Sequence, residues 1–74
     1  MKCIVKISWD EEARIWYSRA DDVLRLVLES GSFDALVERI RIAAPEMLEL
    51  NYGYQGPIEL VFEAERIDHL EKVS

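Results

Sequence analysis

The order in which hydrophobic periods follow one another most narrows the folds open to this chain. Apolar residues alternate with polar ones in residues 2–9, return in an aromatic and β-branched run at residues 14–20, and alternate again in residues 24–29. They then recur every three or four residues in residues 33–48, and alternate once more in residues 58–65. A period of two is typical of strands and a period of 3.6 of helices. The order predicts three strands, a helix and a fourth strand.

The links between the first three runs are short and acidic. Asp10-Glu11-Glu12-Ala13 joins the first two runs, and Asp21-Asp22 stands before the third. A parallel crossover needs a dozen or more residues, so we expect these three strands to pair antiparallel. The predicted class is α+β, a two-layer β-β-β-α-β domain whose helix covers one sheet face. We expect one domain over residues 1–66 and a C-terminal tail over residues 67–74.

Signals at both ends of the helical run support its assignment, and one residue interrupts it. Ser32 is a suitable N-cap, and Asp34 in the first turn favours the helix dipole. Residues 51–57 contain every type of turn residue and end the helix. Pro45 lacks an amide hydrogen. We therefore expect a kink at Pro45, or a break with a second helical segment that begins there.

Charge and cysteine content restrict the partners and the compartment. Nine Lys and Arg residues stand against fifteen Asp and Glu, for a net charge of −6. Nucleic-acid binding relies on Lys and Arg, so the balance disfavours direct contact with nucleic acid and favours a basic protein partner. The one cysteine, Cys3, lies in an apolar strand pattern and is expected to be a small buried hydrophobe. With no 18-residue apolar segment or signal peptide, we expect a cytoplasmic protein without membrane contact.

No residue pattern predicts a chemical reaction. Acidic residues cluster in three places, at Asp10-Glu11-Glu12, at Asp21-Asp22 and at Glu63 with Glu65. Neighbouring acids in turns usually point apart into solvent, although convergence on a metal ion remains an alternative. His69, the one histidine, is expected at the surface of the charged tail. We expect no catalytic residue, no metal site and no cofactor.

Two groups of apolar residues are candidates for an interaction surface. Aromatic residues surround the first hairpin: Trp9, Trp16 and Tyr17. They fit core or edge packing, and also a protein interface, where Trp and Tyr are common in hot spots. Aliphatic residues are expected on the sheet face that the helix leaves uncovered: Ile4, Val27 and Val61. An uncovered apolar face is a candidate interface.

Several segments together resemble the HicB-like antitoxin domain. They are residues 7–13, 15–17, 21–23, 26–30 and the helix from Phe33 onward, and the helix end at residues 44–51 resembles a short standalone branch of unknown function. The resemblance implies a partial ribonuclease H-like fold without nuclease activity. It also implies antitoxin-type capping of a small basic toxin that cleaves messenger RNA. Full antitoxins usually carry a further DNA-binding domain, for which 74 residues leave no room, so we expect no operator binding.

The leading hypothesis is a non-enzymatic protein-interaction domain that forms a homodimer and binds a small basic, toxin-like protein. An orphan domain of another role is the first alternative. A metal-dependent nuclease that uses the acidic turns is the second. RNA binding through the sheet aromatics is the third, and it predicts affinity for single strands that falls with salt.

Overall fold

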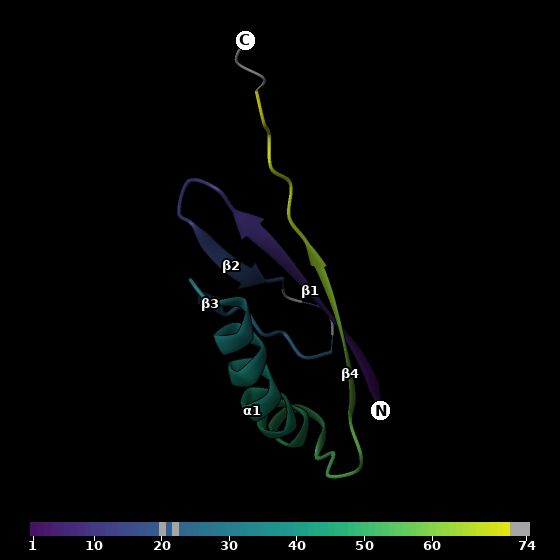
Figure 1. The fold of residues 1–74 in the computed structure, drawn as a ribbon. Coiled ribbons are helices and arrows are strands. Elements are labelled where there is room, and N and C mark those ends of the chain that lie inside the picture. The colour runs from purple at the N-terminus through teal and green to yellow at the C-terminus, as the bar shows by residue number, and fades with distance from the viewer. Residues whose placement is uncertain (20, 22, 72–74) are drawn as a thin grey trace.

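One helix lies against one face of a four-stranded sheet (Figure 1). The computed structural model describes residues 1–19, 21 and 23–71. The elements are β1 (Lys2–Asp10), β2 (Ile15–Ser18), β3 (Glu29–Ser30), α1 (Phe33–Tyr52) and β4 (Glu59–Glu65). The predicted α+β class, with four strands and one helix, is confirmed.

The sheet is mixed, with strand order β3-β2-β1-β4. β1 pairs antiparallel with β2, and β2 pairs antiparallel with β3. β4 returns beside β1 and pairs parallel with it over its whole length, from Lys2 opposite Glu59 to Ser8 opposite Glu65. A parallel pair needs a long crossover, which the segment containing α1 supplies. The sheet is therefore not purely antiparallel, and β4 forms one of its edges.

Alternation along β1 separates a covered sheet face from an open one. Cys3, Val5 and Ile7 are buried, together with Leu36 and Ile40 of α1, in the hydrophobic core. Residues between them, such as Ile4, point away from α1 because successive strand side chains point to opposite faces. We call the side that faces α1 the helix side, and the other side the open face.

The third strand is shorter and later than the predicted residues 24–29. The alternating leucines there belong to a loop that packs into the core, with Leu24 2% exposed. Asp21 Oδ1 accepts hydrogen bonds from the backbone N–H groups of Val23, Leu24 and Arg25. A carboxylate that binds the backbone locally competes with strand pairing. The strand prediction is wrong for this segment because the alternation reflects loop packing.

A buried serine fastens the same loop to β2. Ser18 Oγ accepts the N–H of Leu28 at 2.9 Å and donates to the carbonyl of Leu26 at 3.1 Å. Ser18 N–H also donates to Leu28 O at 2.8 Å. Val27 lies between these anchored leucines, and its side chain is 67% exposed. The expectation that Val27 lies on the uncovered sheet face is therefore wrong, since Val27 is outside the sheet.

α1 runs without interruption from Phe33 to Tyr52. Ser32 Oγ accepts the N–H of Ala35, as its N-cap role predicts, and Gly53 ends the helix with a φ of 65°. Pro45 lies inside the helix, so the predicted break and second segment are wrong. Pro45 and Arg41 are both exposed, so water can satisfy the Arg41 carbonyl that proline leaves without a donor. Burial of core residues before and after Pro45 stabilises one continuous helix.

Candidate functional site

The aromatic residues of the first hairpin lie on two different faces. Trp9 and Trp16 are register partners, and their ring centroids are 5.1 Å apart on the helix side. Trp16 also meets the ring of Phe33 edge to face at 5.2 Å. Tyr17 follows Trp16 in β2 and therefore points to the open face. The three predicted interface aromatics do not form one surface.

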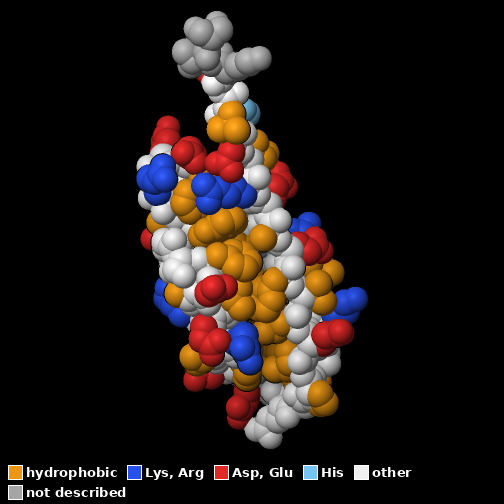
Figure 2. Space-filling view, in the orientation of Figure 1, with side chains coloured by type: hydrophobic (Ala, Val, Ile, Leu, Met, Phe, Trp, Pro, Cys, Tyr) orange, Lys and Arg blue, Asp and Glu red, His pale blue; other side chains and the backbone are white. Residues whose placement is uncertain are grey.

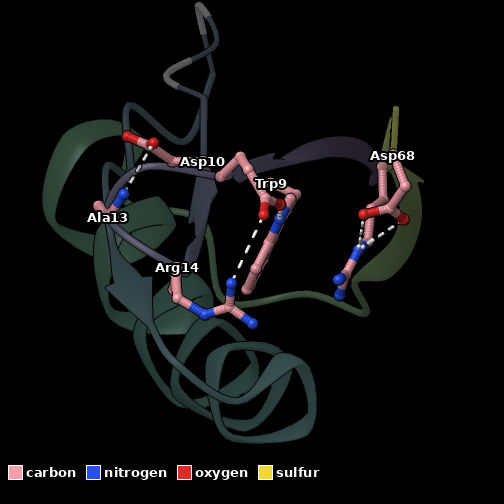
Figure 3. Close-up of polar contacts among 7 residues, drawn as sticks. Trp9, Asp10, Ala13, Arg14 and Asp68 are labelled. Atoms are coloured by element: carbon pink, nitrogen blue, oxygen red, sulfur yellow. Dashed lines mark hydrogen bonds and ion pairs between the residues drawn. The ribbon is translucent and has the colours of Figure 1, made fainter. Parts of the chain in front are cut away.

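An arginine covers the exposed part of this tryptophan pair. The Arg66 guanidinium carbon lies 4.2 Å from the ring centroid of Trp9 and 5.8 Å from that of Trp16. Arg66 Nε also donates to Asp68 Oδ2 at 3.1 Å (Figure 3). Stacked guanidinium and indole groups attract each other through the ring quadrupole. Sequence reasoning missed Arg66, because only the parallel placement of β4 beside β1 brings it to Trp9.

The acidic turn of the hairpin is bonded within itself. Asp10 Oδ1 accepts the backbone N–H of Ala13 at 3.1 Å (Figure 3). Glu11 accepts the indole N–H of Trp9 at 2.7 Å and approaches Arg14 at 3.5 Å. These contacts support the interpretation of this cluster as a hairpin turn.

The other acidic residues do not converge with it. Asp21 holds the backbone of the following loop, Asp22 lies outside the described residues, and Glu63 and Glu65 are exposed on β4. Within residues 1–19, 21 and 23–71 there is no group of three or more His, Cys, Asp or Glu that could hold a metal ion. His69 is exposed in the segment after β4.

Cys3 is a core residue, as predicted. Its side chain is 2% exposed and lies in the hydrophobic cluster. Burial, and after it the charge of Asp21, raises the pKa of the Cys3 thiol, while the N-terminal ammonium acts in the opposite direction. A buried thiol that keeps its proton is a poor nucleophile.

β4 presents a different chemistry on each of its two faces. Glu59, Glu63 and Glu65 are exposed on the open face, whereas Leu60 and Phe62 are half-buried on the helix side. Figure 2 shows hydrophobic side chains in a band along the boundary between α1 and β4, with charged groups on both sides. The outer edge of β4 has no strand partner in the part of the chain that the structure describes. β4 is therefore an amphipathic edge strand.

The backbone of this edge is available for pairing. Glu59 N–H donates inward to Met1 O at 2.7 Å. Since the direction of backbone groups alternates along a strand, the N–H and C=O groups of Leu60, Phe62 and Ala64 point outward. Unpaired groups of this kind are a template for another strand.

The open face carries aliphatic residues, cations and a cavity. Ile4 and Val61 are register partners there, and Ile4 is 44% exposed. Ile4 also borders an open cavity of about 460 Å³, whose lining residues are Lys2, Cys3, Ile4, Lys6, Arg19, Asp21 and Val23. Of the predicted aliphatic group, the structure brings Ile4 and Val61 together and leaves Val27 apart.

These features define a small α+β domain with a mixed sheet, one helix and an unpaired amphipathic edge. The chain matches DUF1902, a domain of unknown function, over residues 2–73, and it belongs to that family. It is also similar to a hypothetical protein, TTHA1013, from the extremely thermophilic bacterium Thermus thermophilus, whose crystal structure superposes with a TM-score of 0.76. The two are 32% identical, and the match covers 95% of this chain and 100% of that one.

Two further searches gave negative results. No curated protein matches this chain. In the described residues, no helix has the length and hydrophobicity needed to cross a membrane.

Proposed function

We propose that this protein is a non-enzymatic interaction domain that binds an extended, basic segment of a partner protein along β4. The observation that carries the proposal is the edge strand itself. β4 combines outward backbone groups with exposed glutamates on one face and half-buried Leu60 and Phe62 on the other. Addition of a strand to an open edge is a common mode of peptide recognition.

The two faces of β4 specify the chemistry of the partner. On the open face, Lys or Arg side chains of an added strand would lie opposite Glu59, Glu63 and Glu65, and opposite charges across strands are favourable. On the helix side, its alternate residues would cover the hydrophobic band beside Leu60 and Phe62 (Figure 2). The expected partner segment therefore alternates basic and apolar residues.

A second copy of this chain suits the β4 edge less well. Symmetric antiparallel pairing centred on Phe62 sets Glu59 opposite Glu65 of the second copy, twice in each pair. Like charges directly opposite each other are destabilising. A homodimer paired in this register is therefore disfavoured.

The resemblance to HicB-like antitoxins provides a biological form for this binding. Those domains generally cap a small basic toxin, and both the net charge of −6 and the acidic face of β4 are complementary to such a partner. The order β-β-β-α-β found here is the order that the resemblance implies. We therefore propose a HicB-like role in which β4 is the toxin-facing strand.

A peptide as long as β4 that alternates Lys with Val tests the proposal in an NMR titration. We expect the largest amide shifts at Leu60, Phe62 and Ala64, because their N–H groups would gain partners. A peptide that alternates Glu with Val is the matched control and should not bind. Shifts spread evenly over the protein, or equal binding of both peptides, would contradict the proposal.

Two substitutions separate backbone pairing from charge attraction. Ala64→Pro removes an outward N–H and leaves the hydrogen bonds between β4 and β1 in place. It should therefore lower the affinity for the Lys-Val peptide about tenfold. Glu63→Lys should weaken it through repulsion, while Glu46→Lys, the same charge change on exposed α1, should have little effect. Unchanged affinity of Ala64→Pro would rule out strand addition at this edge.

A further inference from the structure

Two cations face each other on the open face. The antiparallel register of β1 and β2 sets Ile7 opposite Ser18. One step further along it, Arg19 stands opposite Lys6, and Arg19 N–H donates to Lys6 O at 2.9 Å. Since Ile7 and Ser18 are buried on the helix side, Lys6 and Arg19 both point to the open face. Like charges in this arrangement repel each other.

No described acidic group forms an ion pair with either cation. The ion pairs of the described chain join Arg14 to Glu11, Arg41 to Glu38 and Arg66 to Asp68. Glu63 is the register partner of Lys6 on β4, but the two charged groups are not within 4.0 Å of each other. Two opposed cations with no ion-pair partner among the described residues are unexpected in a protein with a net charge of −6.

Among the described residues, Asp21 is the acid that lines the cavity on the open face. Asp21 Oδ1 accepts three backbone N–H groups, from Val23, Leu24 and Arg25, at 2.9, 2.6 and 3.3 Å. These bonds hold the carboxylate against the loop that follows β2, and Asp21 forms no ion pair with Lys6 or Arg19. Lys2 adds a third cation to the lining of the same cavity.

The cations line a cavity with an apolar wall. Lys6 and Arg19 line the cavity of about 460 Å³, and they also line a neighbouring one of about 250 Å³ to which Glu63 and Glu65 contribute. Ile4 and Val23, 44% and 36% exposed, form the apolar part of the larger cavity. Ligand pockets commonly have volumes of about 300–1,000 Å³ and combine apolar walls with a few polar groups.

We propose that this cavity binds a small organic anion whose phosphate or carboxylate head lies between Lys6 and Arg19. A guanidinium group can bind either head through two parallel hydrogen bonds, and the neighbouring ammonium adds a second charge. The apolar body of the ligand then covers Ile4 and Val23. Binding removes the repulsion between Lys6 and Arg19 and so gives both side chains a partner.

Phenyl phosphate and benzoate, titrated into the isotope-labelled protein, test the two head groups. We expect shifts in the signals of Lys6, Arg19, Ile4 and Val23 with at least one of them. Phenol, which lacks the charge, and inorganic phosphate, which lacks the apolar body, should each bind at least about tenfold more weakly than phenyl phosphate. Binding of phenyl phosphate alone identifies a phosphate head, binding of benzoate alone identifies a carboxylate head, binding of both shows that the site accepts either, and binding of neither overturns the proposal.

Matched variants decide whether the named residues form the site. Arg19→Gln and Lys6→Gln should each lower the affinity for the anion about tenfold. Arg41→Gln, the same loss of charge at an exposed position of α1, should leave that affinity unchanged. Ile4→Ala should lower the affinity for phenyl phosphate and not that for inorganic phosphate. This difference tests the apolar wall independently of the cations. Equal weakening by Arg41→Gln, shifts confined to other regions, or binding of phenol as tight as that of phenyl phosphate would overturn the proposal.

Discussion

Cations on the two faces of the sheet differ in the contacts that they make. On the helix side, Arg66 is stacked on Trp9 and paired with Asp68. On the open face, Lys6 and Arg19 stand opposite each other, and neither forms an ion pair with a described acid, although Glu63 is the register partner of Lys6. Arg66 is thus held between an aromatic ring and a carboxylate, whereas Lys6 and Arg19 have no such contact among the described residues. The comparison indicates that the helix side holds the fold together and the open face is available for binding.

Two isoleucines of β1 provide the strongest test of this comparison. Ile7 is 1% exposed on the helix side, and Ile4 is 44% exposed on the open face. Ile7→Ala should lower the free energy of unfolding by about 2–5 kcal/mol, as buried large-to-small changes do. Ile4→Ala should lower it by less than about 1 kcal/mol, because little apolar area is lost. Urea unfolding of both variants measures the difference, and similar losses would break the comparison.

The compensated cation is expected to contribute to stability. Arg66→Ala removes the stacking on Trp9 and the ion pair with Asp68, and should lower the free energy of unfolding by about 0.5–1 kcal/mol. Lys is a weaker stacking partner than the planar guanidinium, so Arg66→Lys should recover only part of the loss. Chemical unfolding followed by tryptophan fluorescence measures both. No loss in Arg66→Ala would show that the arginine only covers the rings.

Removal of Arg19, which has no ion-pair partner among the described residues, is expected to raise stability rather than lower it. Arg19→Gln removes repulsion from Lys6 and should raise the free energy of unfolding by a few tenths of a kcal/mol in low salt. Added salt screens exposed charges, so the gain should shrink at high ionic strength. Arg41→Gln, whose guanidinium has Glu38 as a partner, is the control and should show no gain. A loss of stability in Arg19→Gln would mean that this arginine has a compensating contact.

The smallest effect is expected from Cys3 at moderately alkaline pH. Folding raises the pKa of its thiol, so its contribution to stability is complete below the pKa of the unfolded chain. The contribution then declines as the pH rises toward the folded pKa, because the unfolded thiol ionises first. Between neutral pH and about pH 9.5, the wild-type protein should therefore lose slightly more stability than Cys3→Ala. Parallel losses in the two proteins would contradict this assignment.

Local sequence patterns predicted the elements in which buried and exposed residues follow each other with a regular period. Alternation identified β1 and β4 because each has one face turned to the core, and the 3.6-residue period identified α1 for the same reason. The same method failed where alternation had another cause, as in the leucines before β3, which pack as a loop held by Asp21 and Ser18. The alternative of a break at Pro45 was also wrong, because core residues before and after Pro45 are buried in one helix despite one missing hydrogen bond.

The candidate sites were only partly predictable for a different reason. Ile4 and Val61 were expected on the uncovered face because strand alternation is a local property. The separation of Tyr17 from Trp9 and Trp16 follows from the register of β1 and β2. That register could not be assigned from the sequence, because apolar residues occupy both odd and even positions of residues 14–20. Arg66 could not be found at all, since its contact depends on where β4 joins the sheet.

The sequence by itself determined the α+β class, the order of strands and helix, the N-cap of α1 and the acidic balance, because these depend on composition or on neighbours a few residues apart. Only the tertiary structure decided that β4 lies parallel to β1 at the sheet edge and that Arg19 stands opposite Lys6. These pairings join residues far apart in the chain, and many registers bury similar apolar area. The proposed partner edge and the proposed anion site both depend on these tertiary pairings.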